Sequence, residues 1–102
     1  MTRQVEVILS PEAMDHLADL QAYYRRTIIN AIEKHLTVGP TVPTQQRKPL
    51  RPNPFASWEL RVGQFRVYYQ VESENDNLIV YIVAVGRKVR NRIIIGREEA
   101  HL

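Results

Sequence analysis

The sequence predicts one α+β domain spanning residues 1–102, with two N-terminal helices packed on one face of a small, mainly antiparallel sheet. Three observations lead to this prediction. Apolar residues recur at helical spacing between residues 11 and 38, and five of the six prolines fall in residues 40–54. From residue 57 onward, apolar and polar residues alternate, which is the period of strands.

The chain opens with a short strand followed by helical sequence. Residues 4–9 alternate between polar and apolar side chains, which predicts a strand. Ser10-Pro11-Glu12 then favours a helix start, because serine can cap, proline suits the first helical position and a carboxylate favours the positive end of the helix dipole. Apolar residues follow at steps of three and four as far as Leu36, with a break expected near Leu20-Gln21. Gly39-Pro40 ends the second helix.

The proline-rich stretch of residues 40–54 is predicted to be an ordered or semi-ordered loop. Proline lacks a backbone N–H, so this stretch can form neither a helix nor a central strand. The loop carries Arg47, Lys48 and Arg51. Loops of this length are uncommon in small domains and are often functional.

Two alternating strands and a tight turn follow the loop. Trp58–Val62 and Phe65–Val71 alternate in polarity, and Gly63-Gln64 between them suits a type II′ turn. Side chains of one face must pack on the helices, and those of the other face point away from them. The first face carries Trp58, Leu60, Phe65, Val67 and Tyr69, and the second carries Arg61, Arg66 and Tyr68.

A third strand and a short tail complete the expected order β-α-α-β-β-β. Leu78–Val85 is apolar on both faces, which is typical of a strand in the middle of a sheet. We expect Gly86 to end it. A basic segment at residues 87–92 and a β-prone patch at residues 93–95 then lead into a polar tail.

Basic residues are concentrated in the second half of the chain. Between Arg47 and Arg97 there are ten Lys or Arg residues and four Asp or Glu residues, a net charge of +6. The rest of the chain carries four basic and seven acidic residues. This segment predicts a polyanionic partner, most simply nucleic acid, and a solvated surface of Arg and Lys is the alternative.

The composition argues against several kinds of site. The chain has no cysteine, which excludes disulfides, thiolate metal sites and a cysteine nucleophile. The three histidines are far apart and the four glycines are scattered singly, so we expect no metal, no phosphate-binding loop and no cofactor. No apolar run approaches the roughly 20 residues that cross a bilayer, and no signal peptide is evident, so we expect a cytoplasmic protein without a membrane partner.

Three motifs resemble the RelE/ParE superfamily of bacterial toxins from toxin–antitoxin systems. Trp58–Val71, which reads WELRVGQFRVYYQV, has the Leu-Arg, the turn and the aromatic-Arg-Val-x-Tyr of that family. Val85–Lys88 resembles its Val-Gly-basic motif, and Lys48–Arg51 resembles its x-Pro-Leu loop. The resemblance covers nearly the whole chain and implies a RelE-like fold and a cognate antitoxin as partner.

The resemblance leaves the target open. RelE-like members cleave mRNA in the ribosome, so the first hypothesis is a ribosome-dependent, metal-independent mRNA endonuclease that inhibits translation. ParE-like members poison DNA gyrase without an RNase site, so the alternative is a gyrase inhibitor or a degenerate toxin that only binds its antitoxin. A generic RNA- or DNA-binding domain is a third interpretation.

Cleavage of RNA without a metal needs a base for the 2′-OH, cations for the phosphate charge and an acid for the leaving oxygen. The planar fork of arginine suits phosphate. The resemblance and the predicted strand faces nominate Arg66, Arg61 and Lys88 as catalytic residues, and Lys48, Arg51, Arg87 and Tyr68 as RNA-binding residues.

Each of these residues also has a structural interpretation. Arg61 and Arg66 could form ion pairs on a solvated strand face with Glu59, Glu72 or Glu74, and Tyr68 could be a packing aromatic. The loop cations could be an ordinary charged loop. On the helices, Met14, Leu17, Tyr23, Tyr24 and Ile28 could pack in the core or dock an antitoxin helix.

Two positions depart from the family pattern. Ile94 stands near the place where RelE-like enzymes commonly carry Tyr or His, and Glu59 stands where certain members have Lys. His101 could approach the site, although we expect the chain end to be disordered. The sequence therefore identifies neither a general acid nor a general base.

Overall fold

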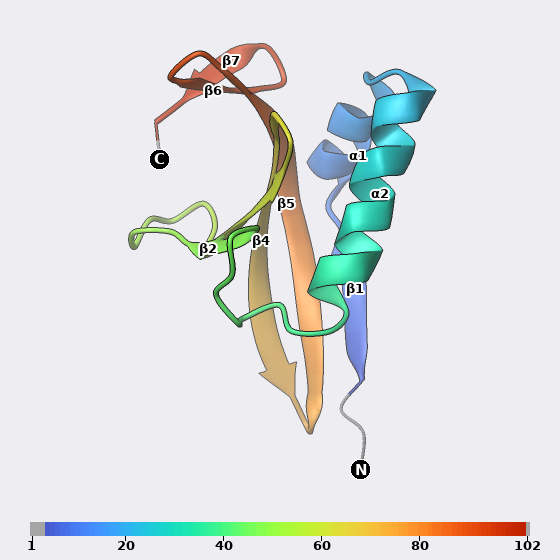
Figure 1. The fold of residues 1–102 in the computed structure, drawn as a ribbon. Coiled ribbons are helices and arrows are strands. Elements are labelled where there is room, and N and C mark those ends of the chain that lie inside the picture. The colour runs from blue at the N-terminus through green and yellow to red at the C-terminus, as the bar shows by residue number, and fades with distance from the viewer. Residues whose placement is uncertain (1–3, 102) are drawn as a thin grey trace.

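The computed structural model describes residues 4–101 and places two helices on one side of a curled sheet (Figure 1). In these residues no helix is long and apolar enough to cross a membrane. The elements in chain order are β1 (Val5–Leu9), α1 (Pro11–Ala18), α2 (Ala22–Leu36), β2 (Arg47–Pro49), β3 (Trp58–Val62), β4 (Phe65–Glu74), β5 (Asn77–Val89), β6 (Arg92–Ile95) and β7 (Glu98–Ala100).

The sheet is organised around β5. Antiparallel pairs give the order β2-β3-β4-β5-β6-β7, and β1 pairs with β5 in parallel. Because β4 covers one edge of β5 from Asn77 to Arg87, β1 and β6 must share the other edge. There β1 pairs with Leu78–Ile82 and β6 pairs with Gly86–Val89. The predicted α+β class is confirmed, with β5 as the central strand.

The two helices begin and separate as the sequence predicts. Ser10 Oγ accepts a hydrogen bond from the Ala13 N–H at 3.0 Å, which caps α1. After α1, Arg25 reaches back and donates to the carbonyls of Leu17 at 3.0 Å and Leu20 at 2.8 Å. A cation bonded to these C-terminal carbonyls fixes the corner between the helices, because it satisfies acceptors that the helix leaves unpaired.

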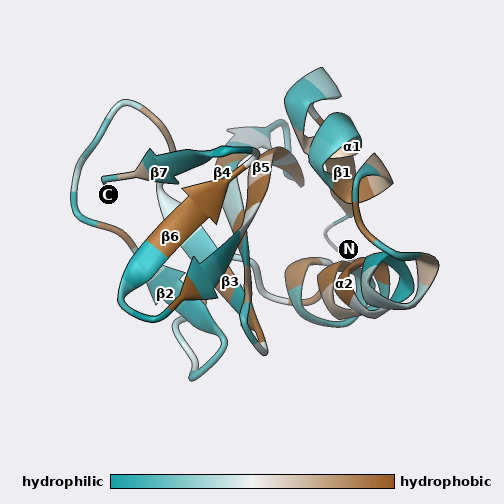
Figure 2. Ribbon diagram, turned by 90° about the horizontal axis from the view of Figure 1, so that it is seen from above, coloured by the Kyte–Doolittle hydropathy of each residue, from teal (hydrophilic) through white to brown (hydrophobic). Residues whose placement is uncertain are grey.

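Side chains on the two faces of the sheet form two separate apolar clusters. The larger lies between the helices and the sheet. Figure 2 shows from above that both helices lie on the same side of the strands. Its buried members are Ala13, Leu17, Ile28, Ile32, Leu36, Leu60, Val67, Tyr69, Val80, Ile82 and Val85. The sheet face away from the helices, called the open face from here on, carries the smaller one. That cluster consists of Ala56, Tyr68 and Ala84, with Leu50, Phe55, Val83, Ile93 and Ile95 packed against it.

The proline-rich loop is held down by hydrogen bonds to its backbone. The hydroxyl of Tyr69 donates to the Pro40 carbonyl at 2.6 Å, within the core. Arg47 donates to the carbonyls of His35 at 2.7 Å and Val42 at 2.8 Å, which ties the end of α2 to β2. Partial burial, with the neighbouring Lys34 and Arg47, lowers the pKa of His35. Part of the loop is the short edge strand β2, a position that tolerates proline.

The prediction that β5 ends at Gly86 was wrong. The strand continues to Val89, and residues 92–100 fold back as the β6–β7 hairpin instead of a tail. Gly86 is needed for close packing rather than as a strand breaker. A Cβ atom there would lie 2.8 Å from the Ile94 carbonyl oxygen and 2.9 Å from Ile95 Cγ1, so only glycine lets β6 approach.

We expect Gly86→Ala to destabilise the domain by about 1–3 kcal/mol, because the added methyl group must displace the backbone of β6. Urea denaturation followed by circular dichroism would measure this. Gly63→Asn is the matched control. Gly63 has a φ of +58°, which asparagine tolerates, and a Cβ atom added there would have no neighbour within 4 Å, so the control should lose less than about 1 kcal/mol. Equal losses in the two variants would contradict the packing role.

Candidate functional site

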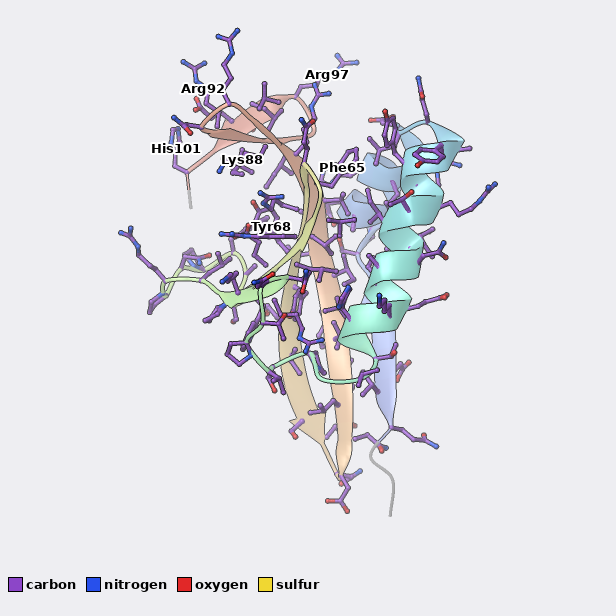
Figure 3. The ribbon with its side chains drawn as sticks, in the orientation of Figure 1. Phe65, Tyr68, Lys88, Arg92, Arg97 and His101 are labelled. Atoms are coloured by element: carbon purple, nitrogen blue, oxygen red, sulfur yellow. The ribbon has the colours of Figure 1, made fainter. Side chains whose placement is uncertain are left out.

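The strand register brings four of the predicted cations together on the open face. Arg61 on β3 lies opposite Arg66 on β4, which lies opposite Gly86 on β5. Lys48 on β2 lies opposite Glu59, and Lys88 follows Gly86 by two residues and so faces the same way. Figure 3 shows Lys88 and Tyr68 on the side of the sheet away from the helices, whereas Phe65 points toward them.

Glu59 lies between the two arginines of this group. Its Oε1 atom is 2.9 Å from Arg66 Nε and 3.4 Å from Arg61 Nε. The Glu59 and Arg66 side chains are nearly buried, while 48 % of the Arg61 side chain is exposed. The geometry therefore matches the structural interpretation of Arg61 and Arg66, in which both form ion pairs, and Glu59 is the carboxylate that they share.

The guanidinium of Arg66 also holds the β3–β4 turn. Arg66 Nη1 donates to the Gly63 carbonyl at 2.7 Å and to the Phe65 carbonyl at 2.8 Å. Arg66 has only 8 % of its surface exposed, and a charge so placed needs a partner and hydrogen bonds to offset its desolvation. Glu59 supplies the ion pair and the two carbonyls supply the hydrogen bonds, so Arg66 stabilises the β3–β4 hairpin.

Tyr68 is a packing aromatic, since only 1 % of its surface is exposed. Its ring contacts that of Phe55 in a tilted arrangement with the centroids 5.6 Å apart, and its burial leaves no exposed ring face on which a nucleotide base could stack. Burial, and then the nearby Glu59 carboxylate, raise the pKa of Tyr68 to about 12. A phenol in this setting keeps its proton at neutral pH.

The remaining predicted residues differ in where they face. Lys88 and Arg51 are exposed and Lys48 is half-buried. Lys48, Arg51 and Lys88 form no ion pair with another described residue. Arg87 instead lines a pocket with Ile94, opposite it on β6, and with His16 of α1. The structure therefore does not bring Arg87 and Ile94 to the side of Arg66.

Lys48, Arg61, Arg66 and Lys88 still outnumber the carboxylates of Glu59 and of Glu98, which lies in the same register row on β7, so this end of the open face is positively charged. Such a surface can attract a polyanion. The arginine with the most specific geometry, however, already holds a carboxylate and two carbonyls.

Comparison with known proteins identifies the family. Residues 7–92 match the model of the ParE toxin of the type II toxin–antitoxin system parDE. The chain belongs to this family of toxins. No curated protein sequence matches it. Among solved structures, it is similar to a chain of the RelBE2 toxin–antitoxin complex from Mycobacterium tuberculosis. That match has a TM-score of 0.66 at 19 % identity and covers 83 % of this chain and 99 % of the other. The toxin thus has a RelE-like fold.

Sequence reasoning named Glu59 as a departure from the family pattern but did not fix it as the partner of Arg66. The available signal was alternation, which places Glu59 and Arg61 on the same face of β3. The sequence analysis did not identify Arg25 and Arg47 as residues that link separate segments, because the carbonyls to which they donate lie in other segments of the chain.

We expect Glu59→Gln to destabilise the toxin by about 1–3 kcal/mol, because the buried guanidinium of Arg66 would lose its carboxylate. Glu99→Gln is the control, since it removes an exposed pair of 3.7 Å with Arg92 and should change stability by less than about 0.5 kcal/mol. Thermal unfolding would measure both variants. Similar melting temperatures for the two would show that Glu59 is no more than a surface charge.

Stability should fall as the pH rises from about 10 toward 12. The fold favours the protonated phenol of Tyr68, so the stability this contributes is present below the unfolded pKa and is lost as the pH approaches the folded value. Tyr68→Phe should weaken this pH dependence in urea unfolding, whereas Tyr23→Phe should not, because 71 % of Tyr23 is exposed. A Tyr68→Phe protein with the wild-type pH dependence would contradict the assignment.

Proposed function

We propose that the toxin acts by binding a protein target, as a ParE-like inhibitor of DNA gyrase, and not by cleaving RNA. The observation that carries this proposal is the engagement of Arg66 with Glu59 and with the carbonyls of Gly63 and Phe65. To bind a phosphate, Arg66 would have to break its ion pair with Glu59 and leave that carboxylate unpaired in a nearly buried site, which costs free energy. The same carboxylate would repel the charge that develops on the phosphate.

The groups around Arg66 also fit proton transfer poorly. Glu59 is paired with two guanidinium groups, and Tyr68 is buried with its pKa raised to about 12. A general acid or base works best with a pKa near the working pH. Ile94, which stands in the sequence near the place of the family's Tyr or His, has no titratable group and lies on the face of the sheet opposite to Arg66.

The helices offer a surface that suits a protein target. Met14 on α1 and Tyr23 on α2 are 58 % and 71 % exposed, and Ile29 and Tyr24 are also exposed. Exposed apolar and aromatic side chains are typical of protein–protein contact sites. We infer that the gyrase contact includes Tyr23.

The mRNA endonuclease remains a second candidate, favoured by the cation excess at Lys48, Arg61 and Lys88. Lys48 and Lys88 have no carboxylate partner among residues 4–101. In this alternative they would contact the RNA backbone, and cleavage would depend on the ribosome for the missing proton transfer.

Two parallel assays of the purified toxin would separate these candidates. One follows supercoiling and DNA cleavage by gyrase, and the other maps mRNA 5′ ends on programmed ribosomes. We expect trapped gyrase–DNA cleavage complexes and no codon-positioned cuts. Tyr23→Ser should weaken gyrase inhibition by about tenfold, since an exposed interface tyrosine is a frequent hot spot. Lys88→Ala should stay within about threefold of wild type.

The reverse pattern would overturn the proposal. Codon-positioned mRNA cleavage that Lys88→Ala abolishes would establish the endonuclease. Arg26→Ala on α2 is the control for a general effect of removing an exposed cation, and it should leave mRNA cleavage unchanged.

A further inference from the structure

A second surface lies beside β1 and extends to the β6–β7 hairpin. A groove of about 510 Å³ runs between β1, the middle of β5 and the β6–β7 hairpin. Its apolar lining includes Ile8, Phe55, Tyr81, Val83 and Ile95. Part of its lining, Phe55, Val83, Ala84 and Ile95, belongs to the smaller apolar cluster of the open face. Neither Glu59 nor Arg66 lines the groove.

The margin of the groove is acidic. Glu12 and Glu98 line it, and among the described residues no Lys or Arg does. The strand register adds two more carboxylates, because Glu6 on β1 and Glu72 on β4 flank Ile79 on the same face of the sheet. Salt bridges among residues 4–101 involve none of these four carboxylates. The charge is thus available to a partner.

The apolar floor is incompletely covered. Tyr81 lies between Ile8 on β1 and Gln70 on β4, and 38 % of Ile8 is exposed. The β1 neighbours of Ile8, Val7 and Leu9, which face the helices, pack instead against the larger cluster. An exposed apolar strip with charged margins is typical of a docking site.

The backbone in the groove is already hydrogen-bonded. Between the residues of β5 that pair with β1 and those that pair with β6, two side chains form hydrogen bonds with the β5 backbone. Ser10 Oγ donates to the Val83 carbonyl at 2.8 Å, and His16 Nδ1 accepts from the Val85 N–H at 3.2 Å. A partner would therefore bind this stretch through side chains in the groove rather than by adding a strand to β5.

We propose that this groove binds a segment of the cognate antitoxin that combines an apolar anchor with flanking Lys or Arg residues. The apolar anchor would contact Ile8, Tyr81 and Val83, and the cations would meet Glu12 and Glu98. Charge complementarity argues for this occupant, because an acidic segment would be repelled by the same margin. The inference rests on membership of the toxin family and holds whether the toxin acts on gyrase or on mRNA.

Binding of the purified toxin to its cognate antitoxin tests the proposal, with affinity measured by titration calorimetry. We expect Glu12→Lys/Glu98→Lys to weaken the complex at least tenfold and Glu12→Gln/Glu98→Gln to weaken it two- to fivefold. Glu33→Lys/Asn30→Lys on exposed α2 adds charge elsewhere and should stay within twofold. Rising salt should weaken the wild-type complex more than the charge-reversed one.

Peptides tiled along the antitoxin sequence would identify the segment. We expect the peptide that binds to contain Lys or Arg beside apolar residues, and to lose affinity for Ile8→Ser toxin. An acidic peptide in the groove, or unchanged affinity in both double variants at positions 12 and 98, would overturn the proposal.

Two further readouts keep the outcomes distinct. Circular dichroism checks that the variants fold, and Glu12→Gln/Glu98→Gln serves as the test if the charge-reversed protein does not. Sedimentation of the toxin alone would reveal a dimer that the charge reversal dissociates, and that result would assign the groove to a second copy. Gyrase inhibition by the free charge-reversed toxin should match wild type, so failure of the gyrase proposal would leave the antitoxin result interpretable.

Discussion

The fold depends on the hydrogen bonding of β5 along both of its edges. β4 occupies one edge, while β1 and then β6 occupy the other. The register between β4 and β5 shifts at Tyr68–Tyr69, which leaves Val83 as the extra residue on β5. Such a bulge bends a strand and increases its twist. The bend lets one strand serve a parallel pair under the helices and an antiparallel hairpin at its far end.

This arrangement explains which parts of the fold were predictable. Alternation assigned the faces of β3 and β4 correctly, and the apolar run of Leu78–Val85 identified the central strand. The β-prone patch at residues 93–95 is β6, as predicted. The continuation of β5 past Gly86 and the strand β7 were missed, because glycine in a strand was interpreted as its end. Its actual role, close contact with Ile94 and Ile95, depends on residues that only the folded register brings near. Local propensity contains no information on such a contact.

The sequence predicted which face of the sheet carries the basic residues of the site, but it did not predict which of them pair with a carboxylate. Period-two alternation put Arg61 and Arg66 on one face, and it put Glu59 there as well. Whether two cations remain available or share a carboxylate depends on side-chain conformation and burial. At 8 % exposure, Arg66 lies where desolvation outweighs surface screening, so pairing with Glu59 is favoured over a free guanidinium. Half-exposed Arg61 is under no such constraint.

Successive open-face residues of β4 show how the two ends of this face differ. Arg66 is cationic, Tyr68 is buried and aromatic, Gln70 is neutral and Glu72 is anionic. Six residues of strand separate Arg66 from Glu72, a distance of roughly 20 Å. The Debye length in physiological salt is about 8 Å, so the charges at one end are largely screened from the other. A partner drawn to Glu6 and Glu72 therefore need not compete electrostatically with a polyanion at Lys48 and Lys88. Glu98 lies in the same register row as Arg66, three strands across, and is nearer to those cations.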